Sequence, residues 1–333
     1  MNEMGKVAVI GNGSWATALA KLLLYNCDRI GWFVHRRDRI DDFIRYRRNP
    51  VYLSDVSFDT ARIDFSDDID LVCSQADTLV LAVPSPYLKE TMGKLSVDIS
   101  GKNVVSAVKG IVPDENVIVT DWLAGRFGVS EERLLVIGGP CHAEEVALER
   151  MSYLTIGCHD TQRSEAFAEL IRGKKMRTII SADVEGIEYG AVLKNVYAIA
   201  AGIISGMKAG DNFVAMMVSN AIREMARFID AISPMPGRDI CRSAYLGDLL
   251  VTAYSRFSRN HNFGSMIGKG YSVTAAIMEM AMVAEGYYGT KCIHQINADG
   301  PGVRMPILDA VYRILYERQS PRIALEAIGE SFA

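Results

Sequence analysis

Hydrophobic residues in the first half of the chain fall in short runs bounded by glycine, proline or polar residues. Such continuous apolar runs are typical of strands buried on both faces of a sheet. Segments with helical periodicity separate them, beginning with Ser14–Tyr25. Strands are predicted at Lys6–Ile10, Arg29–His35, Thr78–Ala82, Asn103–Ala107, Leu134–Gly138, Tyr153–Gly157 and Met176–Ser181. This alternation predicts an α/β fold with a mostly parallel, doubly wound sheet.

From Val184 onward the pattern changes, because strand-like runs give way to long stretches with helical periodicity. A chain of 333 residues is also long for a single core. We therefore predict a doubly wound domain over residues 1–184 and an all-α domain over residues 185–333. The helices of the second domain are predicted at Ile187–Met207, Phe213–Ala231, Asp248–Arg256, Ser272–Tyr288 and Pro306–Arg318.

The first of these helices, Ile187–Met207, is almost long and apolar enough to span a membrane. Lys194 and Asn195 fall in the middle of the run, and Glu188 lies one and a half turns earlier. Ionisable residues are rare in membrane spans, so the pattern favours a buried core helix.

Composition narrows the class of protein further. Hydrophobic residues make up 49% and charged residues 23% of the chain, as in ordinary globular proteins. A net charge of −4 argues against a nucleic-acid partner or an acidic membrane surface. A first strand at Lys6 leaves no room for a signal peptide, and scattered cysteines without a C-x-x-C pair predict reduced thiols, so we expect a cytoplasmic protein without a metal site. The cysteines are Cys27, Cys73, Cys141, Cys158, Cys241 and Cys292.

The stretch VAVIGNGSWATALA around Gly11 carries the strongest chemical signal. Gly11, Gly13 and Ala16 form G-x-G-x-x-A between a predicted strand and a predicted helix. The first glycine allows a tight turn, the second lets the backbone approach a pyrophosphate, and Ala16 keeps helix and strand close. The N–H groups at the helix start then face the phosphates. The first domain is therefore predicted to be a Rossmann-type dinucleotide-binding domain; the alternative is a glycine turn without a ligand.

The end of the second strand predicts which dinucleotide binds. NAD-specific folds carry Asp or Glu about 20 residues beyond the glycine turn, on the ribose 2′-hydroxyl. This chain has His35-Arg36-Arg37 there, and arginine holds a 2′-phosphate through charge-assisted bonds, which favours NADPH. For the arginines that follow, at Arg39, Arg45, Arg47 and Arg48, we prefer a solvated helix face.

Three further strand ends carry candidate ligand groups, since α/β sheets bind ligands at the carboxyl ends of their strands. They are Val83-Pro84-Ser85, Val108-Lys109-Gly110, and the glycine turn Gly139-Pro140-Cys141. Lys109 can reach a cofactor or an anionic substrate, although a surface lysine in a loop fits the same pattern.

Lys194 is the most informative side chain of the second domain. A lysine buried in an apolar helix is costly unless it is paired or used, and burial moves its pKa toward neutrality, which suits a proton donor or acceptor. The alternative is a lysine whose amine reaches solvent. Asp248 either caps a helix start or faces Lys194. Ser258-Arg259-Asn260 offers donors for a phosphate, although a loop at a helix end uses the same residue types.

Together these residues resemble those of bacterial NAD(P)-dependent glycerol-3-phosphate dehydrogenases along essentially the whole chain. The matching pieces, in the family's order and spacing, are GNGSWATALA, VPS, VKG, GGPCHAEE, GAVLKN, LGDLL, SRN, AEGYYGTK and RMPILDAVYRILY. The resemblance implies an oxidoreductase with a Rossmann domain and a helical domain. It implies interconversion of dihydroxyacetone phosphate and sn-glycerol 3-phosphate with NADP or NAD, which supplies phospholipid synthesis, and a possible homodimer.

The resemblance also implies roles by position. Lys194 of GAVLKN is the expected proton donor and acceptor. The expected substrate-binding residues are Lys109, Gly139, Cys141, Lys194, Asp248, Ser258, Arg259 and Asn260. The expected cofactor-binding residues are Gly11, Gly13, Ser14, Trp15, His35, Arg36, Tyr52, Lys109, Ala143, Arg259, Val283 and Glu285.

The chain departs from the family pattern at three positions. Ala16 replaces the third glycine, which the Rossmann pattern tolerates, and Val108 replaces the usual hydroxyl residue before the lysine of VKG. Cys141 stands where a hydroxyl residue is common, which puts a substrate bond from that side chain in doubt because a thiol donates weakly. We interpret His142 as incidental to catalysis.

Two other functions fit the residues without the resemblance. A dehydrogenase acting on a carboxylate hydroxy acid would share the two-domain plan, and Arg259 suits a carboxylate too. A module that binds NADPH without turnover would have no need for a buried Lys194, which weighs against it.

Overall fold

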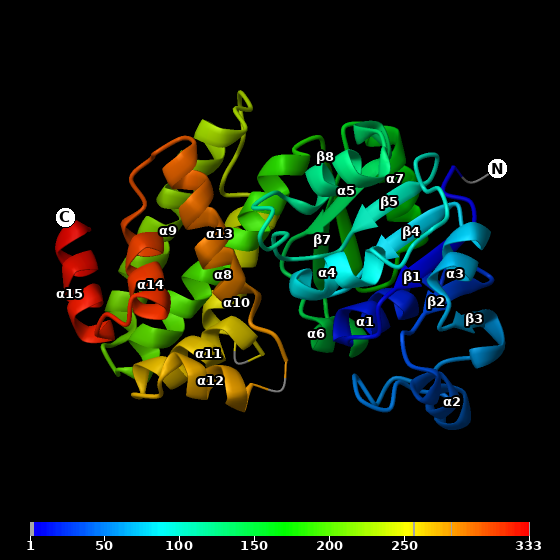
Figure 1. Cartoon of the computed structure of the whole chain (residues 1–333), viewed down its shortest axis with the longest axis horizontal. Helices are drawn as coiled ribbons and strands as arrows, with labels where there is room; N and C mark the ends of the chain where they lie inside the picture. Colours follow the sequence, from blue (N-terminus) through cyan, green and yellow to red (C-terminus); the bar gives the residue numbers. More distant parts are fainter. Residues whose placement is uncertain (1–2, 256, 281, 333) are drawn as a thin grey trace. The chain divides into compact units, whose positions relative to one another are not determined.

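The computed structural model describes residues 3–255, 257–280 and 282–332. The chain divides into two compact units (Figure 1). Each unit contains buried hydrophobic residues of its own. The first unit comprises Met1–Val108 and Val119–Val184, and the second comprises Lys109–Ile118 and Glu185–Ala333. The short segment that begins at Lys109 therefore packs with the helical part of the chain.

The first unit is built on an eight-stranded sheet in the order β3-β2-β1-β4-β5-β6-β7-β8. All neighbouring strands are parallel except β6 and β7, so the doubly wound, mostly parallel sheet is confirmed. The first six strands follow the 3-2-1-4-5-6 order of dinucleotide-binding folds. The strands are β1 (Val7–Ile10), β2 (Ile30–Phe33), β3 (Ile63–Ser66), β4 (Thr78–Leu81), β5 (Asn103–Ser106), β6 (Leu134–Gly138), β7 (Ser152–Gly157) and β8 (Met176–Ser181).

Helices accompany these strands in the order that the alternation predicts. They are α1 (Ser14–Leu23), α2 (Arg37–Tyr46), α3 (Ile69–Gln75), α4 (Ser85–Met92), α5 (Val119–Phe127), α6 (Ala143–Ala147) and α7 (Thr161–Leu170). Beside α2, the ring of Trp32 packs against Phe43, Phe58 and Phe65 at centroid distances of 5.1, 5.8 and 5.6 Å. This aromatic cluster anchors the β2 end of the sheet.

Among its described residues the second unit contains helices and no strand, apart from an isolated β-bridge between Val112 and Val117. Its helices are α8 (Val184–Gly206), α9 (Asp211–Ile232), α10 (Asp248–Tyr254), α11 (Arg259–Gly268), α12 (Val273–Glu279), α13 (Glu285–Asp299), α14 (Pro306–Tyr316) and α15 (Pro321–Ser331). Among the described residues, α8 alone is long and apolar enough to cross a membrane, and its apolar stretch is fully buried inside the protein. The core-helix interpretation is thus confirmed.

Glycines allow α8 and α11 to pack with their backbones in contact. A Cβ added at Gly202 would lie 2.0 Å from the carbonyl oxygen of His261, and one at Gly264 would lie 2.1 Å from that of Ile199. No larger residue fits these positions without moving a helix. This close crossing places α11 along the C-terminal half of α8.

Four features of the fold differ from the predicted elements. The edge strand β3 was not predicted, because Ile63-Asp64-Phe65-Ser66 alternates apolar and polar residues and lacks the continuous apolar run from which the other strands were predicted. The continuous helix predicted at Ser272–Tyr288 is wrong: α12 ends at Glu279 and α13 begins at Glu285. Helical periodicity continues across this break, so periodicity alone did not reveal it.

Helix α15 was also not predicted. Neither was helix α11, since Gly264 and Gly268 lower its helix propensity. Its glycines serve the close contact with α8 instead. The predicted helix Asp248–Arg256 is present as α10, which ends at Tyr254, and Arg256 lies outside the described residues.

Candidate functional site

The glycine turn after β1 has the geometry that its sequence predicts. Gly11 has a φ of 122°, and a Cβ added there would lie 2.6 Å from the carbonyl oxygen of Ala82. Gly13 is the N-cap of α1, whose start is capped by no side chain of the described residues. A Cβ on Gly13 would meet no described atom within 4 Å, so space for a phosphate lies beside the turn. The residues present therefore fit a dinucleotide.

Two side chains that the fingerprint does not include hold this turn in place. Trp32 Nε1 donates to the carbonyl oxygen of Gly11 at 2.7 Å. Buried Asn49 donates through Nδ2 to the carbonyl oxygen of Asn12 at 3.0 Å, and its Oδ1 accepts from the N–H of Tyr52 at 3.1 Å. Asn49 thus connects the glycine turn to the loop that carries Tyr52, one of the expected cofactor residues. Sequence reasoning missed both Trp32 and Asn49.

Arg36 and Arg37, which follow β2, are already paired with acids. Arg36 forms a bidentate ion pair with Asp38, with Nε 2.9 Å from Oδ1 and Nη2 bonded to Oδ2. The hydrogen bond from Arg36 is the main reason why the pKa of the Asp38 carboxyl lies below its usual value. Arg37 Nε lies 3.6 Å from Asp41 Oδ1, and Arg37 Nη1 lies 3.8 Å from Asp67 Oδ1. A 2′-phosphate that uses Arg36 would therefore compete with a carboxylate.

The second glycine turn, after β6, directs a thiol toward the backbone. Gly139 has a φ of 104°, and a Cβ there would lie 2.8 Å from the carbonyl oxygen of Tyr153. Cys141 is buried, and its Sγ donates to the Gly139 carbonyl oxygen at 3.1 Å. Ala143 begins α6 directly after this turn, with His142 as the N-cap residue.

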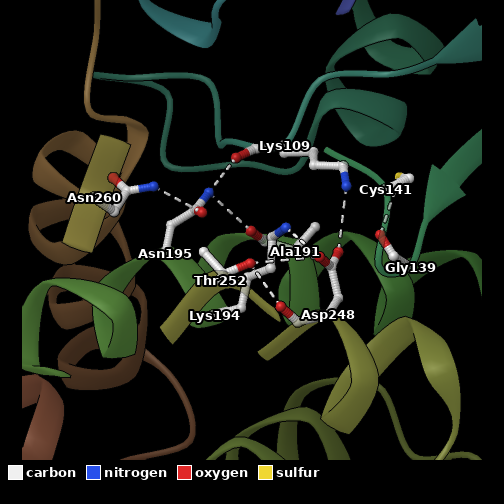
Figure 2. Close-up of polar contacts among 9 residues, drawn as sticks. All are labelled: Lys109, Gly139, Cys141, Ala191, Lys194, Asn195, Asp248, Thr252 and Asn260. Carbon is white, nitrogen blue, oxygen red and sulfur yellow. Dashed lines mark hydrogen bonds and ion pairs between the residues drawn. The ribbon is translucent and has the colours of Figure 1, made fainter. Parts of the chain in front are cut away.

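In the second unit, two lysines converge on one buried carboxylate (Figure 2). Lys194 Nζ lies 2.5 Å from Asp248 Oδ1, and Lys109 Nζ lies 3.4 Å from Asp248 Oδ2. Lys194 is 4% exposed and Asp248 1% exposed, so the expectation of a buried lysine is confirmed. Removing one partner from a buried pair is costly, because the other charge is left uncompensated.

Asp248 is the centre of this ionic cluster of Lys109, Lys194 and Asp248. Burial opposes its ionisation, but the charges and hydrogen bonds of the two lysines outweigh burial and lower the pKa of its carboxyl. A π-helical turn, Ser243–Gly247, runs directly into α10, so Gly247 rather than Asp248 is the N-cap residue. Of the two interpretations of Asp248, the structure supports the partner of Lys194.

Thr252 lies one turn after Asp248 on α10. Its hydroxyl donates to the main-chain carbonyl of Asp248 at 2.6 Å and lies 3.5 Å from Oδ1. It was missed in the sequence because a threonine inside an apolar helix gives no signal of its own.

The segment Ser258-Arg259-Asn260 lies at the start of helix α11. Ser258 is the N-cap of α11, and its Oγ accepts from the N–H of His261 at 3.2 Å. Arg259 Nη1 donates to the carbonyl oxygen of Val283 at 3.4 Å, which brings two expected cofactor residues together. Buried Asn260 bonds to Asn195 at 2.8 Å.

The described contacts connect part of the expected site residues within each unit. In the first unit Asn49 joins the glycine turn to the Tyr52 loop, whereas the paired arginines follow β2 and Cys141 lies in the separate turn after β6. In the second unit Asp248 joins Lys109 and Lys194, and Asn195 joins Asn260 to the carbonyl of Lys109 (Figure 2). Arg259 is linked separately to the segment before α13. The strand order and the glycine turn define a dinucleotide-binding protein that also carries a helical unit with a buried ionic cluster.

Comparison with known proteins identifies the family within this class. The profile described as "NAD-dependent glycerol-3-phosphate dehydrogenase N-terminus" matches residues 6–164, and the corresponding C-terminus profile matches residues 183–326. The chain belongs to the NAD-dependent glycerol-3-phosphate dehydrogenase family, which confirms the resemblance noted in its motifs.

Individual relatives match along almost their whole length. The glycerol-3-phosphate dehydrogenase [NAD(P)+] of Lysinibacillus sphaericus is 34% identical over 98% of this chain and 96% of its own. That of Bacillus subtilis is 33% identical over 98% of this chain and 94% of its own. The crystal structure of glycerol-3-phosphate dehydrogenase from Coxiella burnetii superposes with a TM-score of 0.89 at 26% identity, covering 98% of this chain and 99% of that one.

Proposed function

We propose that this protein is an NAD(P)H-dependent glycerol-3-phosphate dehydrogenase, which interconverts dihydroxyacetone phosphate and sn-glycerol 3-phosphate. The observation that carries the proposal is the buried cluster of Lys194, Asp248 and Lys109 in a chain that also holds a dinucleotide fingerprint. The relatives named above carry this activity in their names, which supports the proposal.

Reduction of a ketone requires a proton at the carbonyl oxygen as well as a hydride at carbon. Bound NAD(P)H supplies the hydride. Lys194 holds a proton at Nζ and is proposed as its donor, and as the acceptor in the reverse direction. Asp248 orients that ammonium through the 2.5 Å contact. Lys109 adds a second positive charge, which offsets the phosphate charge and the developing alkoxide.

The proposed cofactor residues follow the resemblance. Gly13 is best supported, because a Cβ there would fill the space beside the turn. The full proposed set is Gly11, Gly13, Ser14, Trp15, His35, Arg36, Tyr52, Lys109, Ala143, Arg259, Val283 and Glu285. Both NADP and NAD are proposed to bind.

The proposed substrate residues are Lys109, Gly139, Cys141, Lys194, Asp248, Ser258, Arg259 and Asn260. For Cys141 the main-chain groups are proposed rather than the thiol, since Sγ already donates to Gly139. We further propose the domain assignment of residues 1–184 to the dinucleotide and 185–333 to substrate and catalysis. A cytoplasmic location, a homodimer and a supply of glycerol phosphate to phospholipid synthesis complete the proposal.

A steady-state assay tests this function. The purified chain should oxidise NADPH or NADH when dihydroxyacetone phosphate is added, and reduce NADP⁺ or NAD⁺ with sn-glycerol 3-phosphate. A 2-keto acid of similar size serves as the control for the carboxylate alternative. Turnover of the keto acid but not of dihydroxyacetone phosphate would contradict the proposal, as would cofactor binding without turnover of either.

A further inference from the structure

The three carbonyl oxygens of the glycine turn after β1 are each held by a side-chain donor from a different element. The donors come from β2, from the loop after α2 and from α1. The bonds are Trp32 Nε1 to Gly11 at 2.7 Å, Asn49 Nδ2 to Asn12 at 3.0 Å, and Thr17 Oγ1 to Gly13 at 2.9 Å. Three consecutive peptide groups are therefore fixed in orientation.

Fixing a carbonyl oxygen also fixes the N–H group of the next residue. A peptide group is planar and trans, so its N–H points away from its C=O. The held carbonyls thus direct the N–H groups of Asn12, Gly13 and Ser14 away from the three side chains. Within the described part of the chain, these N–H groups donate to no other residue. They lie at the start of α1, where an anion is favoured, and are available to a pyrophosphate.

Asn49 uses its whole hydrogen-bonding capacity inside the protein, where it is 4% exposed. Its Nδ2 donates to the carbonyl oxygen of Asn12 and, at 2.9 Å, to Thr17 Oγ1. Its Oδ1 accepts from the N–H groups of Val51 and Tyr52, both at 3.1 Å. An amide with two donated and two accepted bonds has a single orientation, because turning it over would place its oxygen against the Asn12 carbonyl.

Thr17 connects the Asn49 bond to the next peptide group. Its hydroxyl accepts from Asn49 and donates to the carbonyl oxygen of Gly13, both at 2.9 Å. A hydroxyl carries one proton, and since that proton is directed at Gly13, the oxygen can only accept from Asn49. Asn49 therefore holds the carbonyl of Asn12 directly and supports that of Gly13 through buried Thr17.

We propose that Asn49 is a positioning residue for the dinucleotide, which orients the N–H groups of Gly13 and Ser14 toward the pyrophosphate. It acts through the main chain of the turn rather than through contact with the cofactor. A preorganised turn binds more tightly, because less conformational freedom is lost on binding. The inference rests on the dinucleotide-binding part of the proposed function and adds to it, since Asn49 is not among the proposed cofactor residues.

Asn49→Ser separates the two ends of the amide. A serine hydroxyl accepts from the N–H two residues on, as asparagine does, but it is too short to reach the carbonyl of Asn12. We expect the Kd values of NADPH and NADH to rise about tenfold, the net value of one such bond. The factor should be the same for both and for ADP-ribose, because all three ligands carry the pyrophosphate.

Asn103 provides the matched control. It is 2% exposed in the same unit, and its Nδ2 also donates to a main-chain carbonyl, that of Glu3 at 3.3 Å, and to a threonine hydroxyl, that of Thr78 at 3.4 Å. It begins β5 and so lies at the opposite edge of the sheet from the turn. Asn103→Ser should lower the melting temperature and leave all three Kd values unchanged.

Trp32→Phe tests the same arrangement at another carbonyl. The variant keeps an aromatic ring in the cluster but removes the donor to the carbonyl oxygen of Gly11. The three ligands should again weaken by a common factor. Because it alters a different bond, this variant tests the inference even if Asn49→Ser does not fold.

Turnover separates cofactor positioning from a direct role in the reaction. At saturating NADPH and dihydroxyacetone phosphate, the kcat of Asn49→Ser should stay within about twofold of wild type, as expected when an interaction serves binding alone. The KM for NADPH should rise together with its Kd.

Three results would overturn the inference. Unchanged Kd values in Asn49→Ser, with a melting temperature lowered as in Asn103→Ser, would make the role purely structural. Weaker binding by Asn49→Ala but not by Asn49→Ser would assign the effect to the Tyr52 loop. A larger loss for NADPH than for NADH would connect Asn49 to the 2′-phosphate instead.

Calorimetric titration measures these Kd values without substrate, so the outcome does not depend on turnover. A wild-type chain with this binding pattern that fails to reduce dihydroxyacetone phosphate would contradict the proposed function and leave the role of Asn49 intact. An active enzyme whose Asn49→Ser variant binds all three ligands as tightly as wild type would overturn the inference and leave the proposed function intact.

Discussion

At the scale of single residues, the bidentate ion pair between Arg36 and Asp38 bears on cofactor preference. Because only NADPH carries a 2′-phosphate, Arg36→Asp should weaken NADPH about ten- to a hundredfold more than NADH. Asp38→Asn should do the opposite, since it frees the guanidinium from its competing carboxylate. Asp41→Asn, which removes a partner of Arg37, is the control. Titration of each variant with both cofactors measures the ratio of Kd values; equal weakening of both by Arg36→Asp would show that Arg36 does not contact the 2′-position.

Arg259 is predicted to bind the substrate phosphate. It begins α11 and lies against the carbonyl oxygen of Val283. A planar guanidinium binds phosphate bidentately, and lysine does not reproduce that geometry. Arg259→Lys should therefore raise the KM for dihydroxyacetone phosphate about tenfold or more, with little effect on unphosphorylated dihydroxyacetone. If kcat/KM falls by the same factor for both substrates, Arg259 serves the cofactor or the fold, and the phosphate site must be sought at Lys109.

At the scale of elements, buried Glu224 on α9 caps the start of α14. Its carboxylate accepts from the N–H groups of Ile307 and Leu308, both at 3.0 Å. Burial nevertheless raises the pKa of Glu224 from 4.5 to about 7, against the lowering effect of these bonds. A raised acid pKa contributes stability that is complete below the unfolded value and lost as the pH rises through the folded value.

The expected change from Glu224 is about 3 kcal/mol between pH ~4.5 and ~7. Glu224→Gln removes this titration, so wild-type stability relative to the variant should fall as the pH rises through this window. Denaturant unfolding of both proteins at several pH values measures the difference. Parallel stability curves would show that Glu224 has the same pKa in the folded and unfolded protein.

The close crossing of α8 and α11 predicts that alanine substitutions at two glycines change the free energy of unfolding in opposite directions. Gly264→Ala places a Cβ against the carbonyl oxygen of Ile199 and should cost about 1–3 kcal/mol. Gly125, in α5, has no described atom within 4 Å of an added Cβ, so Gly125→Ala should instead gain up to about 1 kcal/mol. Chemical denaturation measures both. Equal stability of the two variants would contradict the close helix crossing.

At the scale of the whole molecule, the fold followed from the pattern of hydrophobic residues wherever an element was long and buried. The strand at Leu134–Gly138 and the helix around Lys194 were predicted for this reason. The pattern did not reveal α11, because its glycines serve a contact with a distant helix. Burial of Lys194 followed from the sequence, whereas the sharing of Asp248 between Lys194 and Lys109 depends on how three separate segments pack.

The same limit applies to the buried amides of Asn49, Asn195 and Asn260. Each of these amides bonds to backbone groups far along the chain, and no spacing in the sequence indicates such a partner. The glycine turn after β1 differs from these amides, because the residues that determine its conformation are close together in the sequence. The motif G-x-G-x-x-A was therefore sufficient to predict that conformation.

Lys194→Ala tests the central claim of this account most directly. Asp248 keeps its contact with Lys109 in this variant, and NADPH affinity should remain nearly intact, because the lysine is proposed to serve the substrate carbonyl. Turnover of dihydroxyacetone phosphate should fall about 10²–10⁴-fold, the usual contribution of a general acid. Exposed Lys269, at the end of α11, provides the control, and Lys269→Ala should retain full activity. Near-normal turnover by Lys194→Ala would contradict its role as the proton donor.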